Sequence, residues 1–183
     1  MTLDGFMSGP DQGLDWHFTS WTEEMAESAC EQLSKADTIL LGRITYDAMA
    51  GYWPEQAAHA LYSREDVAFA DMMNHYEKIV FSKTLDHTIW SNSRVVHDGI
   101  EEEINRLKKQ PGRDLIIYGS GKLVDGLLQA GLVDEFRIWL HPILIGKGKR
   151  LFKTASSRRM LILFDSKRFG SGVVMLFYKS HKQ

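Results

Sequence analysis

The chain has 183 residues, of which 44% are hydrophobic and 25% are charged, and its formal net charge is −2. This composition is ordinary for a globular protein, and the small acidic charge argues against general nucleic-acid binding. No apolar stretch approaches the ~20 residues of a membrane span, no signal-peptide pattern opens the chain, and a single cysteine, Cys30, excludes an intrachain disulfide. We therefore expect a cytoplasmic protein with one domain over residues 1–183 and no membrane or nucleic-acid partner.

Strand and helix patterns alternate over the first two thirds of the chain, and strand patterns follow one another after residue 135. Alternation is typical of parallel strands with helices on both faces, and consecutive strands are typical of antiparallel pairing. The predicted fold class is α/β, with a mixed, mostly parallel central sheet flanked by helices and with antiparallel C-terminal strands. In chain order we expect a loop at 1–21, a helix from 22, strand 38–41, a short helix at 45–49, a helix over 55–75, strands 77–82 and 93–97, helix 100–109, strand 115–118, helix 122–130, and strands 135–140, 160–164 and 173–178.

Two of the apolar strands stop at a glycine turn that enters a helix. The first is strand 38–41 with Gly42, and the second is strand 115–118 with residues 119–121. A helix start leaves backbone N–H groups free at a positive helix end, which suits phosphate. Two such turns in one small domain favour a single ligand with several phosphates, hence a dinucleotide. The alternative is that both are ordinary turns that need glycine for geometry alone.

Five short motifs in order along the chain resemble the dihydrofolate-reductase-like superfamily. Within it, the chain is most similar to the reductase domain at the C-terminal end of the bacterial riboflavin-biosynthesis deaminase–reductase and to related stand-alone proteins. In that family a strand precedes the first motif, and here that motif begins beside Met1, so we expect either that the given sequence starts late or that the sheet lacks this strand. The motifs are Thr-Leu-Asp-Gly-Phe at 2–6, Leu-Gly-Arg-Ile-Thr-Tyr-Asp at 41–47, Val-Phe-Ser-Lys-Thr-Leu at 80–85, Ile-Tyr-Gly-Ser-Gly-Lys-Leu at 117–123 and His-Pro-Ile-Leu-Ile-Gly-Lys-Gly at 141–148.

The resemblance implies a homodimer that binds NADPH and transfers hydride to a C=N or C=C bond of a small heterocycle. The implied activity is that of a 5-amino-6-(5-phosphoribosylamino)uracil reductase or a relative of it. The turn after strand 77–82 would take the adenosine 2′-phosphate, and the two glycine turns would take the other phosphates. The residues expected to bind the coenzyme are Gly42, Arg43, Thr45, Ser82, Lys83, Thr84, Gly119, Ser120, Gly121, Lys122 and Leu123.

Each of these residues also has an ordinary structural interpretation. Arg43 is four residues from Asp47, and its alternative role is a surface ion pair with that residue. Thr45 is a candidate helix cap. The second glycine turn lacks the third glycine of the Rossmann fingerprint and comes late in the chain, which disfavours a Rossmann domain.

The expected substrate side contains one acid and several aromatic side chains. Asp4 lies in the family's first motif, beside the expected nicotinamide, and would orient a ring nitrogen or relay a proton as the catalytic residue. Its alternative role is a turn residue bonded to nearby backbone. The aromatic residues expected to wall the pocket, or else to fill the core, are Trp16, Tyr46, Trp53 and Tyr118.

Several other functions are disfavoured. The acids of the first helix, Glu23, Glu24 and Glu27, do not match the pteridine-holding acid of folate reductase. The seven histidines are scattered without metal-ligand spacing, so we expect no metal. A second hypothesis remains open: a non-catalytic nucleotide-binding or interaction protein on the same scaffold.

Overall fold

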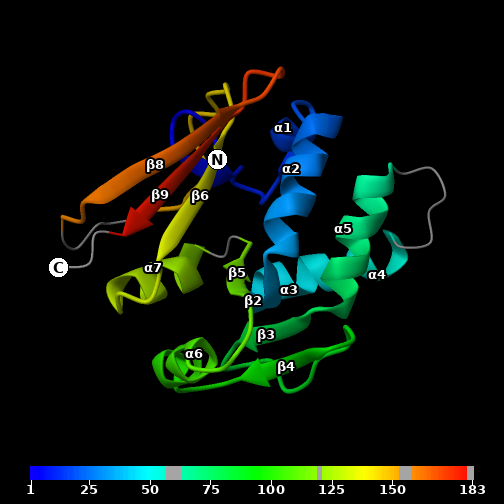
Figure 1. Ribbon diagram of the computed structural model, residues 1–183, viewed down its shortest axis with the longest axis vertical. Coiled ribbons are helices and arrows are strands. Elements are labelled where there is room, and N and C mark those ends of the chain that lie inside the picture. Colours follow the sequence, from blue (N-terminus) through cyan, green and yellow to red (C-terminus); the bar gives the residue numbers. More distant parts are fainter. Residues whose placement is uncertain (57–62, 119–120, 153–157, 181–183) are drawn as a thin grey trace. The chain divides into compact units, whose positions relative to one another are not determined.

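The computed structural model describes residues 1–56, 63–118, 121–152 and 158–180 (Figure 1). The chain divides into two compact units. Residues Glu23–Leu123 form the first, here called the parallel unit, and Met1–Thr22 with Val124–Gln183 form the second, here called the antiparallel unit. The single domain over residues 1–183 stays a prediction.

The parallel unit is built on a four-stranded parallel sheet. Its strands are β2 (Ala36–Gly42), β3 (Glu77–Phe81), β4 (Ser93–Val96) and β5 (Asp114–Ile117), in the order β4-β3-β2-β5. Strand β2 is central, and almost all of it is buried. Its apolar side chains are therefore covered on both faces, as is usual for parallel strands.

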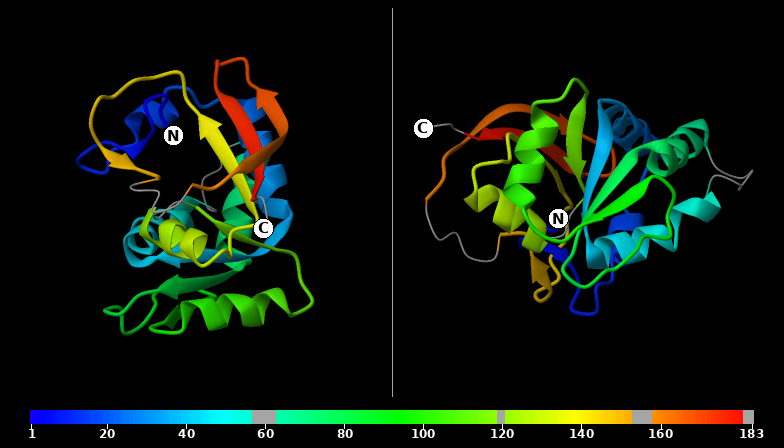
Figure 2. Two further views of the ribbon diagram at one scale, coloured as in Figure 1. Left: turned by 90° about the vertical axis from the view of Figure 1, so that its left-hand side faces the viewer. Right: turned by 90° about the horizontal axis from the view of Figure 1, so that it is seen from below.

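Helices cover the two faces of this sheet. Helices α2 (Glu23–Ser34), α3 (Arg43–Ala50), α4 (Trp53–Gln56) and α5 (Arg64–His75) surround β2, and α6 (Ile100–Lys108) connects β4 to β5. The connection from β2 to β3 and the one from β4 to β5 run in opposite directions across the sheet. Right-handed crossovers therefore place their helices on opposite faces. The right-hand view of Figure 2 shows α6 on one side of the strands and α2 with α5 on the other.

Lys78 ties β3 to the end of α5. Its side chain is fully buried, and its Nζ donates to the carbonyl oxygens of Met73, Asn74 and Tyr76 at 2.8–2.9 Å. These are carbonyls that the C-terminal end of α5 leaves without helical donors. The same ammonium lies 4.5 Å from the ring centroid of Trp90. The strand thereby fixes the helix that covers it.

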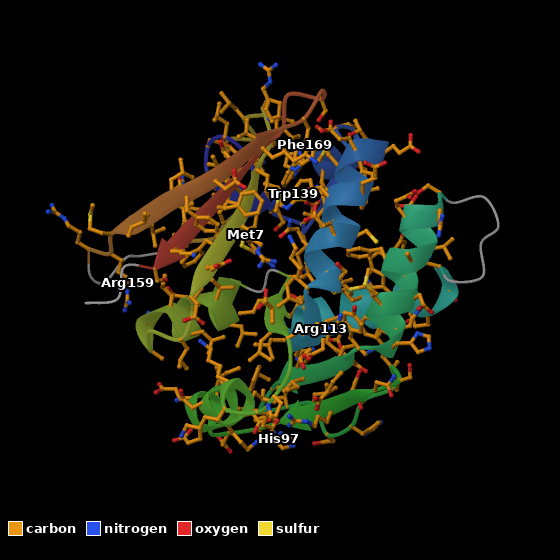
Figure 3. All side chains as sticks on the ribbon, viewed as in Figure 1. Met7, His97, Arg113, Trp139, Arg159 and Phe169 are labelled. Carbon is orange, nitrogen blue, oxygen red and sulfur yellow. The ribbon has the colours of Figure 1, made fainter. Side chains whose placement is uncertain are left out.

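The antiparallel unit contains two further sheets. Strands β6 (Glu135–Leu140), β9 (Val174–Ser180) and β8 (Leu161–Arg168) form one, in the order β6-β9-β8. Strands β1 (Phe6–Ser8) and β7 (Lys149–Arg150) form the other. Helix α1 (Asp15–Phe18) and most of α7 (Gly121–Gln129) complete the unit. Trp139 of β6 stacks on Phe169, with ring centroids 5.0 Å apart (Figure 3).

The predicted fold class is confirmed, and the differences are local. The antiparallel strands form a sheet of their own instead of extending the parallel one. A short strand, β1, lies within the predicted loop 1–21, and β8 continues four residues beyond the predicted strand 160–164. Within the part of the chain that the structure describes, no helix is long and apolar enough to cross a membrane.

Candidate functional site

Three of the predicted coenzyme turns leave neighbouring strands of the parallel sheet. Gly42 of β2 is paired with Phe81 of β3, and Leu40 of β2 is paired with Ile117 of β5. Since the three strands are parallel, the turns that follow them lie along one edge of the sheet, here called the carboxyl edge. This is the edge at which open α/β sheets bind ligands. The ends of β2 and β5, Gly42 and Ile117, are 75 residues apart in sequence and are thus brought to the same edge of the sheet.

Helix α3 begins at this edge directly after β2. Its N-cap is Gly42, in extended conformation with φ −86° and ψ 156°, and its first helical residue is Arg43. The prediction that Thr45 caps the helix is wrong, because the helix starts two residues earlier than expected. Thr45 instead belongs to the first turn, where its N–H is one of those that an α-helix leaves unbonded. Glycine at the N-cap contributes no side-chain acceptor to these groups.

The side chain of Arg43 forms the predicted alternative contact. Its Nη1 donates to Asp47 Oδ2 at 3.1 Å, and both side chains are about half exposed. An exposed pair at i, i+4 is worth well under about 1 kcal/mol. Arg43 can therefore exchange Asp47 for a phosphate at little cost.

The turn after β3 is organised by Ser82. Its Oγ accepts hydrogen bonds from the N–H groups of Thr84 and Leu85 at 3.2 and 3.0 Å. Lys83 is exposed, and its Nζ lies 3.6 Å from Oδ1 of Asp98, which is equally exposed. The turn thus holds a hydroxyl and an ammonium at the edge, together with one carboxylate that competes with an anionic ligand.

His97 and Asp98 are residues at this edge that the sequence did not single out. They follow β4, the neighbour of β3, and the Nδ1–H of His97 donates to the carbonyl oxygen of Ser82 at 2.9 Å. Figure 3 labels His97. The available signal was their position at the end of the predicted strand 93–97, with His97 as its last residue and Asp98 directly after it.

The second glycine turn is described only in part. Gly119 and Ser120 lie outside the described residues. Helix α7 starts at Gly121, with Lys122 exposed and Leu123 buried. The turn therefore enters a helix as predicted, four residues after the end of β5.

The predicted aromatic walls fall into different environments. Tyr46 is 2% exposed, and its hydroxyl accepts the N–H groups of Ile89 and Trp90, both at 2.9 Å. The structure therefore corrects the prediction for Tyr46, which is a core residue that fixes the 89–90 segment. Trp53 and Tyr118 are half-buried and pack against the same core, each beside Phe69.

Asp4 lies in the antiparallel unit, where it holds a loop. Its Oδ1 accepts the hydroxyl of Thr2 at 2.6 Å, and its Oδ2 accepts the N–H groups of Ile145 and Gly146 at 3.1 and 2.8 Å. The bond from Thr2 is the main cause that lowers the pKa of the Asp4 carboxyl. Asp4 is therefore a carboxylate at neutral pH, suited to accept hydrogen bonds and not to donate a proton.

Trp16 belongs to a histidine cluster in the same unit. His141 is 1% exposed, and its Nε2 lies 3.3 Å from Nδ1 of His17, with the Trp16 ring centroid 5.0 Å away. Burial lowers the pKa of His141 to about 4, and the charges of the N-terminus and His17 add to this. Within the described residues, His141 Nδ1 and Trp16 Nε1 are buried without hydrogen-bond partners. The scattered spacing of the histidines concealed this pair.

No group of three or more His, Cys, Asp or Glu side chains with metal-binding geometry occurs among the residues that the structure describes. Besides the carboxylates of Asp47 and Asp98, the groups at the carboxyl edge are backbone N–H groups, hydroxyls, an ammonium and a guanidinium. These other groups are ligands of anions.

The arrangement of strands is that of the dihydrofolate-reductase-like class. Dihydrofolate reductase from Enterococcus faecalis, solved with NADP(H), superposes with a TM-score of 0.63 at 13% identity, covering 100% of this chain and 93% of that one. A putative riboflavin biosynthesis protein from Shewanella sp. PV-4 superposes with a TM-score of 0.79 at 21% identity, covering 100% and 96%.

The sequence narrows this class to one family. The chain belongs to the RibD C-terminal domain family, which it matches over residues 1–175. It is 34% identical over 178 residues to the uncharacterized protein YyaP of Bacillus subtilis (strain 168), covering 97% of this chain and 90% of the relative. The predicted resemblance to the riboflavin reductase type is thus confirmed.

Proposed function

We propose that this protein is an NADPH-dependent reductase that transfers hydride to a C=N or C=C bond of a small heterocycle. The proposed activity is of the 5-amino-6-(5-phosphoribosylamino)uracil reductase type. The observation that carries it is the juxtaposition of the carboxyl ends of β2, β3 and β5 along one edge of the parallel sheet. Membership of the RibD C-terminal domain family supports the same reaction class.

The chemistry of the carboxyl edge fits the phosphates of NADPH. The first turn of α3 offers N–H groups at a positive helix end, and Arg43 adds a guanidinium held only by an exposed ion pair. Lys83 and the hydroxyls of Ser82 and Thr84 suit a terminal phosphate monoester, which favours NADPH over NADH. The start of α7 at Gly121 offers a second helix end. When bound, NADPH supplies the hydride.

The substrate side of the proposal rests on fewer groups. Asp4 is an orienting carboxylate, since its lowered pKa makes it a poor acid, and the proton for the reduced product then comes from water. Trp16, Trp53 and Tyr118 remain candidate walls for a flat heterocycle. The cytoplasmic location and the homodimer also stay predictions.

Ligand-dependent stability tests the coenzyme proposal. NADPH should raise the melting temperature more than NADH at equal concentration, because tighter binding to the native state stabilises it more. The same protein is then assayed for NADPH oxidation against pterins, ribosylaminopyrimidines and cyclic imines. The absence of a melting shift with either coenzyme at saturating concentration would refute the proposal.

A second candidate is a nucleotide-binding protein without catalysis. It is favoured by Asp4, whose two carboxylate oxygens are both engaged within the protein. Binding of NADPH without turnover across the whole substrate panel would support this candidate over the reductase.

A further inference from the structure

The side chain of His97 holds the turn after β3 from the neighbouring strand. Ser82 donates its N–H to the carbonyl oxygen of Val96 at 3.1 Å, which extends the pairing of β3 with β4 by one residue. The carbonyl oxygen of Ser82 in turn accepts the Nδ1–H of His97 at 2.9 Å. Both backbone groups of Ser82 and its Oγ are therefore engaged, so the turn is fixed before a ligand binds.

The bond to Ser82 also decides which nitrogen of the His97 ring changes its charge. A carbonyl oxygen only accepts hydrogen bonds, so Nδ1 carries a proton whether the ring is neutral or charged. The proton that makes the ring an imidazolium is thus added at Nε2, a change that histidine side chains undergo at pH values between 8 and 5. His97 is exposed. The ring can therefore gain a charge facing a ligand while its hold on the turn stays the same.

An acid offsets the ammonium of this turn while His97 is neutral. Lys83 Nζ lies 3.6 Å from Oδ1 of Asp98, and both side chains are 83% exposed. Among the described residues of the adjoining segments, the other permanent cation is Arg94, which is bonded to Glu77 and Glu103. The remaining titratable groups of these segments are Asp86, His87, Glu101 and Glu102. A phosphate monoester, which carries about −1.5 to −2 charges at neutral pH, would gain from one more positive charge here.

We propose that His97 is a specificity-determining residue of the coenzyme site. Its imidazolium form adds a second positive charge beside Lys83 and binds the terminal phosphate that distinguishes NADPH from NADH. This inference rests on the proposed function and adds to it a coenzyme preference that grows as the pH falls. A residue that only shaped the turn would instead affect coenzyme binding equally at every pH.

The ratio of NADPH affinity to NADH affinity, measured by titration calorimetry at pH 8 and pH 6, tests this role. The coenzyme's own phosphate also takes up a proton near pH 6, so His97→Gln is measured in parallel to account for that contribution. From pH 8 to pH 6 the ratio should change in favour of NADPH by about threefold to tenfold more in the unaltered protein than in His97→Gln. The difference should shrink at high salt. The same change in both proteins would overturn the inference and leave the proposed function standing, whereas no binding of either coenzyme would refute both.

Two further variants separate charge from shape. His97→Lys carries a permanent cation, so at pH 8 it should already prefer NADPH more strongly than His97→Gln does, by a similar factor. His75→Gln is the matched control, because His75 is an exposed histidine that precedes β3 and so lies at the opposite edge of the sheet. This variant should keep the pH dependence of the unaltered protein. Equal ratios for His97→Lys and His97→Gln at pH 8, or a pH dependence lost in His75→Gln, would contradict the role of His97.

Discussion

The carboxyl edge of the parallel unit and the Asp4 contacts of the antiparallel unit use polar side chains differently. At the edge, Arg43 and Lys83 meet their acids at 3.1 and 3.6 Å in pairs that are half exposed or more, and the first turn of α3 has a glycine cap. In the antiparallel unit, both oxygens of Asp4 are bonded internally, and His141 is fully buried. Groups held loosely at a surface can exchange partners for a ligand, whereas groups bonded internally determine the shape of the loop they hold.

The largest expected effect is a pH-dependent loss of stability caused by the buried His141, in the unit that does not contain the carboxyl edge. The pKa of His141 is about 4 in the folded protein, against 6.5 for an exposed histidine. The unfolded chain therefore binds the extra proton between these values, and stability falls as pH drops through this window, by about 3 kcal/mol in total. Urea unfolding at pH 7, 6 and 5 should show this loss, and His141→Gln should reduce it.

Carboxylates contribute little to the change in stability over most of the pH range between the two pKa values of His141. Glu103, whose pKa is lowered to about 2 mainly by its bond from Arg106, loses its contribution only as the pH falls below 4.5. An unaltered pH dependence in His141→Gln would contradict the assignment of this buried imidazole.

The second effect tests whether Tyr46 belongs to the core or to the pocket. Tyr46→Phe removes the acceptor of two backbone N–H groups, those of Ile89 and Trp90. We expect a loss of about 1–3 kcal/mol in the free energy of unfolding, since buried donors are left unpaired. NADPH affinity of the folded protein should stay the same. If Tyr46→Phe instead kept full stability and weakened NADPH binding, Tyr46 would be a residue of the ligand pocket.

The third effect tests whether Lys83, in the turn after β3, binds the 2′-phosphate of NADPH. Lys83→Ala should reduce the preference for NADPH over NADH about tenfold, because one charge-assisted bond to the 2′-phosphate is lost. Lys35→Ala is the matched control, as Lys35 is a half-exposed lysine paired with Glu31. Titration calorimetry with both coenzymes measures the ratio. Equal loss of affinity for NADPH and NADH would place Lys83 away from the 2′-phosphate.

The smallest effect tests whether the exposed ion pair with Asp47 competes with NADPH for Arg43. Asp47→Asn removes its ion-pair partner, so NADPH affinity should rise about twofold to fivefold, in line with the small worth of an exposed pair. Arg43→Gln should lower the affinity. The affinity of Asp47→Asn is best compared at low salt, where surface charges are least screened. A fall in affinity for Asp47→Asn would mean that Asp47 positions Arg43 instead of competing for it.

The sequence predicted the parallel sheet and its carboxyl edge because both follow from local patterns. Strands 38–41 and 115–118 are continuous apolar runs ending in glycine, so their burial and their following turns could be inferred before their pairing was known. Thr45 was misplaced by two residues, since helix boundaries depend on hydrogen bonds and not on residue type alone.

The missed features arise from contacts between distant segments. Nothing near Tyr46 in the sequence indicates its hydrogen bonds to residues 89–90. Lys78 is an ordinary polar residue in the sequence, and only the folded position of β3 brings it to the end of α5. The pairing of His17 with His141 spans 124 residues. Spacing along the chain carries no information about such contacts, which only the assembled tertiary structure defines.

The most direct test of the central claim is amide hydrogen exchange with and without saturating NADPH. If one coenzyme lies along the carboxyl edge, protection should increase together at residues 43–45, 82–85 and 121–123, and the loop at 145–146 should change little by comparison. NADPH binding that protects only one of the three turns, or none of them, would contradict the shared site.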